Sequence, residues 1–150
     1  MNLYIAGTFH DPFVESGEAV RILTEHGHTV VSQWHDVDVW RPETQQSTAE
    51  IRAGIAAQNY ADIDRADAVV VIPLVGHHLR GAHTEVGYAI GRGKPVYVLG
   101  DERSMNTMVT HPLVHCIASL ADVPPALDVD AETYVALLRD ITARLRAAKD

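Results

Sequence analysis

The sequence is short of cysteine, of clustered positive charge and of long hydrophobic runs. Its single cysteine, Cys116, excludes a disulfide framework and a multi-cysteine metal site, and is typical of a protein in a reducing compartment. The 12 lysines and arginines are scattered in a chain of net charge -8, which argues against a nucleic acid polymer as partner. No apolar run approaches the roughly 18 residues of a membrane span, and the first residues lack the basic flank of a secretory signal. We therefore expect a cytoplasmic protein that binds a small molecule, with no membrane as partner.

The common nucleotide and metal motifs are missing too. The segment "GTFHDP" has neither the G-x-G-x-x-G of dinucleotide sites nor the G-K-S/T end of a P-loop, although its backbone amides could still bind an anion or a sugar hydroxyl. Three of the nine histidines, His77, His78 and His83, lie in one segment, but their spacing matches no zinc motif. We expect no metal and no cofactor.

What the sequence does contain is an alternation of apolar runs with segments of helical periodicity. This alternation predicts an α/β fold: one domain over residues 1–150, with a doubly wound, flavodoxin- or Rossmann-like sheet of five parallel strands and helices on both faces. The expected strands are residues 2–7, 28–34, 68–74, 94–100 and 113–119. Expected helices run from Pro12 to a stop at Gly27, over residues 47–67 with Ile51, Ile55 and Ile63 at helical spacing, and near the C-terminus with Tyr134, Leu137, Leu138, Ile141 and Leu145 in register.

Ligands of such a fold bind beyond the carboxyl ends of the strands, so the segments that follow the first, third and fourth strands are expected to converge on the site. Glu85 lies after the third strand, in "VGHHLRGAHTE", which is expected to be a loop. Two interpretations of Glu85 stay open. An acidic residue in the first turn of a helix complements the helix dipole, whereas a carboxylate in the site can attack an electrophilic carbon or stabilise a cationic transition state. Trp34 could stack on a base, although a buried aromatic is the commoner outcome.

Four segments together resemble the nucleoside 2-deoxyribosyltransferase superfamily, which includes 2′-deoxynucleoside 5′-phosphate N-hydrolases and CMP hydrolases. They are "NLYIAGTF", "QNYADIDRADAVVVIPL", "GAHTEVGYAIGRGKPVYVL" and "MNTMVTHP", and they span most of residues 2–112. The block "EVGYAIGRGKPV" is the most specific of them. The resemblance implies an enzyme that cleaves the N-glycosidic bond of a 2′-deoxynucleoside and transfers the deoxyribosyl group to another base.

The resemblance also implies roles for particular residues. Glu85 falls on the nucleophile, and Tyr4 on a tyrosine that holds the nucleophile in place. Asn106 falls where transferases have an asparagine that reaches a neighbouring subunit's site, which implies a homodimer or a higher homo-oligomer. The candidate substrate contacts are Gly7, Thr8, Phe9, Trp34, Arg80, Gly81, His83, Asn106 and Met108.

The sequence departs from the family pattern at one position. The family aspartate that contacts or protonates the base falls on Asn59, and an amide cannot act as a general acid. Asp62, one helical turn later, is the nearest substitute and is expected on the same face of the helix. Asn59 and Asp62 therefore complete the candidate catalytic set.

The sequence is compatible with three functions. The leading hypothesis is a deoxyribosyltransferase that acts on nucleosides. A hydrolase of nucleoside 5′-monophosphates would instead use Arg80 to bind the phosphate. A binding or sensing module on the same fold would have lost catalysis through the change at Asn59.

Overall fold

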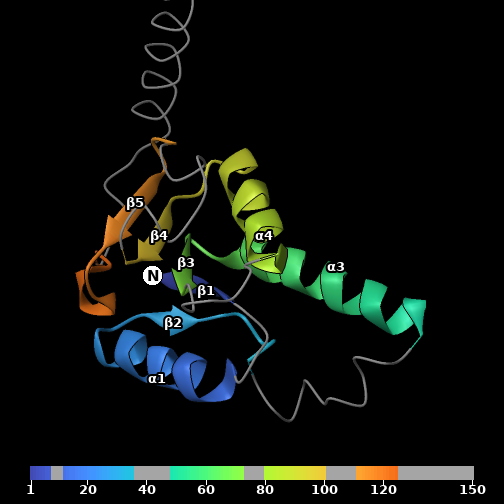
Figure 1. Cartoon of the computed structure of the whole chain (residues 1–150), viewed down its shortest axis with the longest axis horizontal. Helices are drawn as coiled ribbons and strands as arrows, with labels where there is room; N and C mark the ends of the chain where they lie inside the picture. Colours follow the sequence, from blue (N-terminus) through green and yellow to red (C-terminus); the bar gives the residue numbers. More distant parts are fainter. Residues whose placement is uncertain (8–11, 36–47, 73–79, 101–110, 125–150) are drawn as a thin grey trace, which may run out of the picture.

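The computed structural model describes residues 1–7, 12–35, 48–72, 80–100 and 111–124, without the side chains of residues 12–16 and 80. Its strands are β1 (Asn2–Gly7), β2 (Thr29–Val30), β3 (Ala68–Ile72), β4 (Val96–Leu99) and β5 (Val114–Ile117). They form one sheet in the order β2-β1-β3-β4-β5, and every neighbouring pair is parallel (Figure 1). The predicted five-stranded, doubly wound sheet is confirmed. Strand order reverses between β1 and β3, which is where folds of this topology bind ligands.

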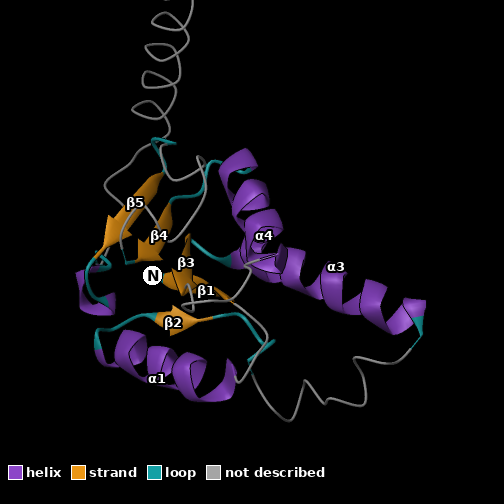
Figure 2. Ribbon diagram, viewed as in Figure 1, coloured by secondary structure: helices purple, strands orange, loops and turns teal. Residues whose placement is uncertain are grey.

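Helices cover both faces of the sheet (Figure 2). Helix α1 (Pro12–Glu25) packs against β1 and β2, while α3 (Ala49–Arg65) and α4 (Arg80–Gly91) lie together on the opposite face, where both contact β1. A short 3-10 helix, η3 (Leu120–Asp122), contacts α1. The predicted C-terminal helix lies outside the described residues.

The core is built on the three central strands. Residues 3–6 of β1, residues 68–71 of β3, and Val96 and Val98 of β4 are completely buried. Because successive strand residues point to opposite faces, only a strand that is covered on both sides can be apolar without interruption. Burial of each valine, leucine or isoleucine contributes about 1.5–3 kcal/mol, so these strands give a rigid base for the segments at their carboxyl ends.

Helices α1 and α4 both end at a glycine, as the sequence predicted for Gly27. In α1, Gly27 has a φ of 83°, and the amide of His28 donates to the carbonyl of Leu23 at 3.0 Å. In α4, Gly93 has a φ of 71°, and the amide of Lys94 donates to the carbonyl of Ala89 at 2.9 Å. Both ends are Schellman motifs, which need a left-handed residue that glycine adopts without strain.

Helix α3 is present, but only its C-terminal part is in the core. Ile63 is completely buried, Ile55 is half-buried, and Ile51 is 44% exposed. Figure 1 shows the N-terminal end of α3 extending away from the sheet. The helical spacing of Ile51, Ile55 and Ile63 therefore marks a face that is buried only toward the C-terminal end of α3, and the last two turns are the part of α3 that contributes to the site.

Candidate active site

Glu85 lies in the middle of α4, since the helix begins at Arg80. No acidic residue occupies the first turn of α4. The interpretation of Glu85 as a residue that complements the helix dipole is therefore wrong. The loop expected over residues 75–85 is also wrong for residues 80–85, which belong to α4. The Glu85 side chain faces the sheet near the point where strand order reverses.

Two side chains from different elements hold one oxygen of the Glu85 carboxylate. The hydroxyl of Tyr4, in β1, donates to Oε1 at 2.7 Å, and Nδ2 of Asn59, in α3, donates to the same oxygen at 3.4 Å. Among the residues that the structure describes, no hydrogen bond reaches Oε2.

The surroundings of Glu85 set its electrostatics. Burial raises the pKa of Glu85 above its usual value, while the hydrogen bonds from Tyr4 and Asn59 favour the ionised form and oppose that rise. The pKa of Tyr4 is raised as well, first by burial and then by the nearby carboxylates of Glu85 and Asp62. Tyr4 therefore keeps its proton and serves as a hydrogen-bond donor.

Asp62 is in a different position from its helical neighbour Asn59. It is completely buried, and its Oδ1 accepts a hydrogen bond from Gln58 at 2.6 Å and an ion pair from Arg65. Its Oδ2 is also buried and has no partner among the described residues. Three residues along a helix turn the side chain by about 300°, which is a net offset of about 60° around the axis. With this offset Asn59 reaches Glu85, whereas Asp62 is buried in the protein.

Strand β2 ends at Val30, four residues before the predicted end, and side chains replace the missing part of its ladder. The hydroxyl of Ser32 accepts a hydrogen bond from the amide of Ile5 at 3.1 Å, and Nε1 of Trp34 donates to the carbonyl of Ile5 at 2.6 Å. Both Ser32 and Trp34 are buried. These contacts satisfy the backbone of β1 next to Tyr4, and so they support the residue that holds Glu85.

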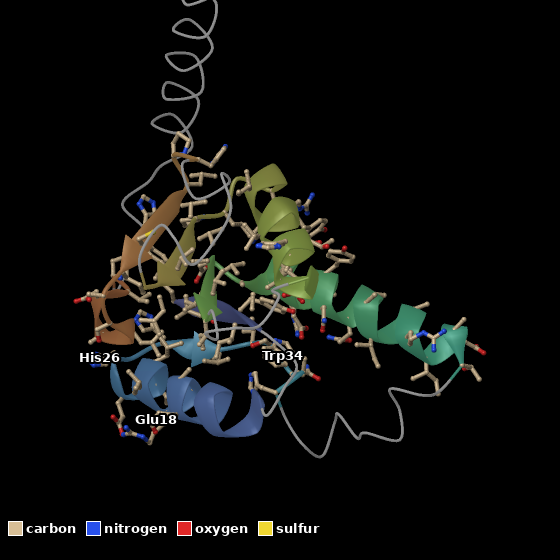
Figure 3. The ribbon with its side chains drawn as sticks, viewed as in Figure 1. Glu18, His26 and Trp34 are labelled. Atoms are coloured by element: carbon tan, nitrogen blue, oxygen red, sulfur yellow. The ribbon has the colours of Figure 1, made fainter. Side chains whose placement is uncertain are left out.

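Trp34 also lies over the carboxyl end of β1, beyond the end of β2 (Figure 3). A methyl group added at Gly7 would lie 3.4 Å from the Trp34 ring. The indole nitrogen is already bonded to Ile5. The Trp34 side chain therefore packs beside Gly7, and the residue as a whole is only 8% exposed.

The remaining predicted substrate contacts are only partly placed. Gly81 and His83 are exposed on α4, and Arg80 is the first residue of that helix. Thr8, Phe9, Asn106 and Met108 lie outside the described residues, as do His77 and His78. In the described part of the chain, no group of three histidines, cysteines or acidic residues gathers as a metal site would require.

Two supporting residues were missed in the sequence. Gln58 precedes Asp62 by four residues, a spacing that places two helical side chains in contact. Ser32 follows the apolar pair Val30 and Val31, and a polar side chain at a buried position needs a hydrogen-bond partner. Both signals were present, but neither identifies the partner backbone or the role in the site.

The arrangement fits nucleophilic or electrostatic catalysis at a carbon that becomes positively charged. Neutral donors do not cancel the charge of an ionised carboxylate. A buried environment strengthens the attraction of that charge to a cation. Apart from its two hydrogen-bond donors, no side chain of the described part contacts the carboxylate through a hydrogen bond or an ion pair.

Comparison with known proteins identifies the family to which the chain belongs. A family model described as nucleoside 2-deoxyribosyltransferase matches residues 3–133. No curated protein matches the chain. In the part of the chain that the structure describes, no helix is long and apolar enough to cross a membrane.

Two solved structures have a similar fold. The 2-deoxyribosyltransferase of the psychrotolerant bacterium Bacillus psychrosaccharolyticus is 24% identical, with a TM-score of 0.62 over 89% of this chain and 96% of the other. The CMP N-glycosidase of Clostridium botulinum is 20% identical, with a TM-score of 0.51 over 78% of this chain and 88% of the other. At these identities the similarity establishes the fold.

Proposed function

The chain belongs to the nucleoside 2-deoxyribosyltransferase family, and from that membership we propose that it cleaves the N-glycosidic bond of 2′-deoxynucleosides and transfers the deoxyribosyl group to another base. Glu85 is the nucleophile. The observation that carries this proposal is the hydrogen bond of 2.7 Å from Tyr4 to Oε1 of Glu85, which fixes the carboxylate and leaves Oε2 free of described partners.

Cleavage of an N-glycosidic bond builds positive charge on the sugar ring in the transition state. The Glu85 carboxylate opposes that charge from a site where burial strengthens the attraction. Tyr4 acts as a positioning residue, because its hydrogen bond directs the carboxylate and favours the ionised form that attack requires.

The reaction consists of two displacements at the anomeric carbon. In the first, Oε2 of Glu85 forms a bond to this carbon while the bond to the base breaks, and its electron pair leaves with the base. In the second, a nitrogen of the incoming base forms a bond to the same carbon and releases its proton to water, and the electron pair of the ester bond returns to Glu85. Two displacements on opposite faces retain the configuration of the sugar.

A nucleotide N-hydrolase is the second candidate, because water can capture the same ester intermediate. The first half of the reaction and the role of Glu85 are then unchanged. Arg80, at the start of α4, would bind a 5′-phosphate in that case. If the protein is instead the transferase, Asn106 would complete the active site of a neighbouring subunit. The transferase is therefore proposed to be a homodimer or a higher homo-oligomer.

The test is a chromatographic assay for free base. The protein is incubated with deoxynucleosides and with their 5′-monophosphates, with and without an acceptor base, beside Glu85→Gln. Base release that Glu85→Gln lowers at least about a thousandfold supports the nucleophile, since loss of such a group typically costs this much or more. Exchange that requires the acceptor indicates the transferase, and release from monophosphates without an acceptor indicates the hydrolase.

Two outcomes contradict the proposal. Release that survives Glu85→Gln would exclude Glu85 as the nucleophile. Binding of a nucleoside without release in either protein would identify a binding or sensing module. Asp64→Asn is the matched control, because it makes the same chemical change at a carboxylate that lies outside the candidate site on α3.

A further inference from the structure

The groups around Glu85 differ in whether they can give a proton to a departing base. The hydroxyl of Tyr4 donates to Glu85, and the raised pKa of Tyr4 makes it a poor acid. Asp62 is completely buried and held by Gln58 and Arg65, so a base cannot contact it without a rearrangement of α3. His83 is exposed and precedes Glu85 by two residues, which turns it about 200° away around α4.

Asn59 is the remaining polar side chain that contacts Glu85 in the described part of the chain. A carboxylate only accepts hydrogen bonds, so the amide must direct its NH2 group toward Oε1. That group carries two hydrogens, and the contact of 3.4 Å to Oε1 uses one of them. The second hydrogen can be donated to a ligand next to the carboxylate.

We propose that Asn59 stabilises the departing base as an anion through a neutral hydrogen bond, and that the site therefore selects bases that are good leaving groups. The inference rests on the proposed function. Oε2 of Glu85 forms the bond to the anomeric carbon, the electron pair of the glycosidic bond moves onto the base, and the Asn59 amide binds the ring atom that carries the new charge. The base takes a proton from water after it leaves.

Without proton transfer, the rate of base release depends steeply on the stability of the base anion. Substrates that differ in this property but not in shape test the proposal. Bromine and a methyl group are similar in size, and so are chlorine and a methyl group, whereas the halogens withdraw electrons. The pairs are 5-bromo-2′-deoxyuridine with thymidine, and the 2′-deoxyribosides of 6-chloropurine and 6-methylpurine, each also as the 5′-monophosphate.

The experiment measures the rate of the first base release with enzyme in excess, so that later steps do not contribute. We expect the halogenated member to react roughly tenfold faster or more in at least one pair. Asn59→Asp places a second carboxyl group within hydrogen-bond reach of Glu85, where one of the two stays protonated and can act as an acid. This variant should accelerate the poor substrate most and reduce the ratio to below about threefold. Ala57→Asp, at an exposed position of α3, controls for the added charge.

The outcomes separate this inference from the function on which it rests. A ratio near one in the unaltered protein would overturn the inference and show that an acid elsewhere in the chain protonates the base. A steep ratio that Asn59→Asp does not reduce would overturn the role of Asn59. No release from any of the substrates would overturn the proposed function itself, and the inference with it.

Discussion

Two carboxylates lie at the interface of α3 and α4, and each accepts a hydrogen bond from a tyrosine. Glu85 accepts from Tyr4 at 2.7 Å, and Asp64 accepts from Tyr88 at 3.0 Å. Their other partners differ. Asp64 is paired with Arg92 at 2.8 Å and lies near the surface, with a side chain that is 37% exposed. Glu85 is more buried, and its second donor is the neutral amide of Asn59.

The difference separates a structural carboxylate from a reactive one. Arg92 neutralises Asp64, and this ion pair links the C-terminal end of α3 to the C-terminal end of α4. Tyr4 and Asn59 orient Glu85 without neutralising it, and burial raises its pKa. An uncompensated charge in a buried site lowers the stability of the folded protein. Loss of stability of this kind is typical of functional sites, where a ligand can supply the missing countercharge.

Among changes to the partners of the two carboxylates, the largest effect is expected when the tyrosine beside Glu85 is changed. Tyr4→Phe keeps the buried ring but removes a hydrogen bond to a charged group, which is worth about 1.5–3 kcal/mol, so kcat/KM should fall by roughly 10- to 100-fold. That hydrogen bond lowers the pKa of Glu85. Its loss raises this pKa, and the acidic limb of the pH–rate profile moves to higher pH.

Tyr88→Phe is the matched control and should leave both kcat/KM and the profile unchanged within about twofold. Equal losses in the two variants would show that the tyrosines act through stability alone. A loss in Tyr4→Phe without movement of the acidic limb would show that Tyr4 does not act through Glu85.

A smaller effect is expected in the pH dependence of stability. Because the folded protein raises the pKa of Glu85, its stabilising contribution is complete below the unfolded value of about 4.3 and is lost as pH rises through the folded value. Glu85→Gln removes this dependence. Relative to the unaltered protein, the variant should therefore gain stability between about pH 4 and pH 7.

Urea unfolding at the two pH values measures this gain, with Asp64→Asn as the comparison. Asp64→Asn breaks the ion pair with Arg92 and is expected to be less stable than the unaltered protein at neutral pH. If Glu85→Gln lost stability between the two pH values, burial would not dominate the electrostatics of the site, and the contrast between the two carboxylates would fail.

The sequence allowed most of the fold to be predicted, because the central strands are apolar without interruption. Their burial on both faces determines the class of sheet, and the positions of Gly27 and Pro12 determine the ends of α1. Strand β2 was predicted too long, since Ser32 and Trp34 look like strand residues but pair with Ile5 through their side chains. Periodicity does not distinguish a backbone ladder from such a replacement.

The site was harder to predict, because it joins residues that are distant in the chain. Tyr4 and Glu85 are 81 residues apart, and only the family resemblance connected them. Helical spacing placed Asn59 and Asp62 on one face. The small angle between them around the helix is nevertheless enough for Asn59 to contact Glu85 while Asp62 is buried in the interior. That distinction depends on how α3 sits against β1, which no local pattern specifies.

The smallest effect is expected at Arg92, whose side chain is 54% exposed. Arg92→Met removes the partner of Asp64, and exposed ion pairs contribute about 1 kcal/mol or less. The loss should disappear at about 1 M salt, where the Debye length is roughly 3 Å, and base release should not change. Unfolding in urea at low and high salt measures the first expectation, and the base assay measures the second.

The hydrogen bond from Tyr4 to Glu85 has a neutral donor in a buried site, so the loss of activity in Tyr4→Phe should persist in high salt. If salt abolished both effects, both carboxylates would behave as surface charges, and Glu85 would lack the buried environment on which its proposed chemistry depends.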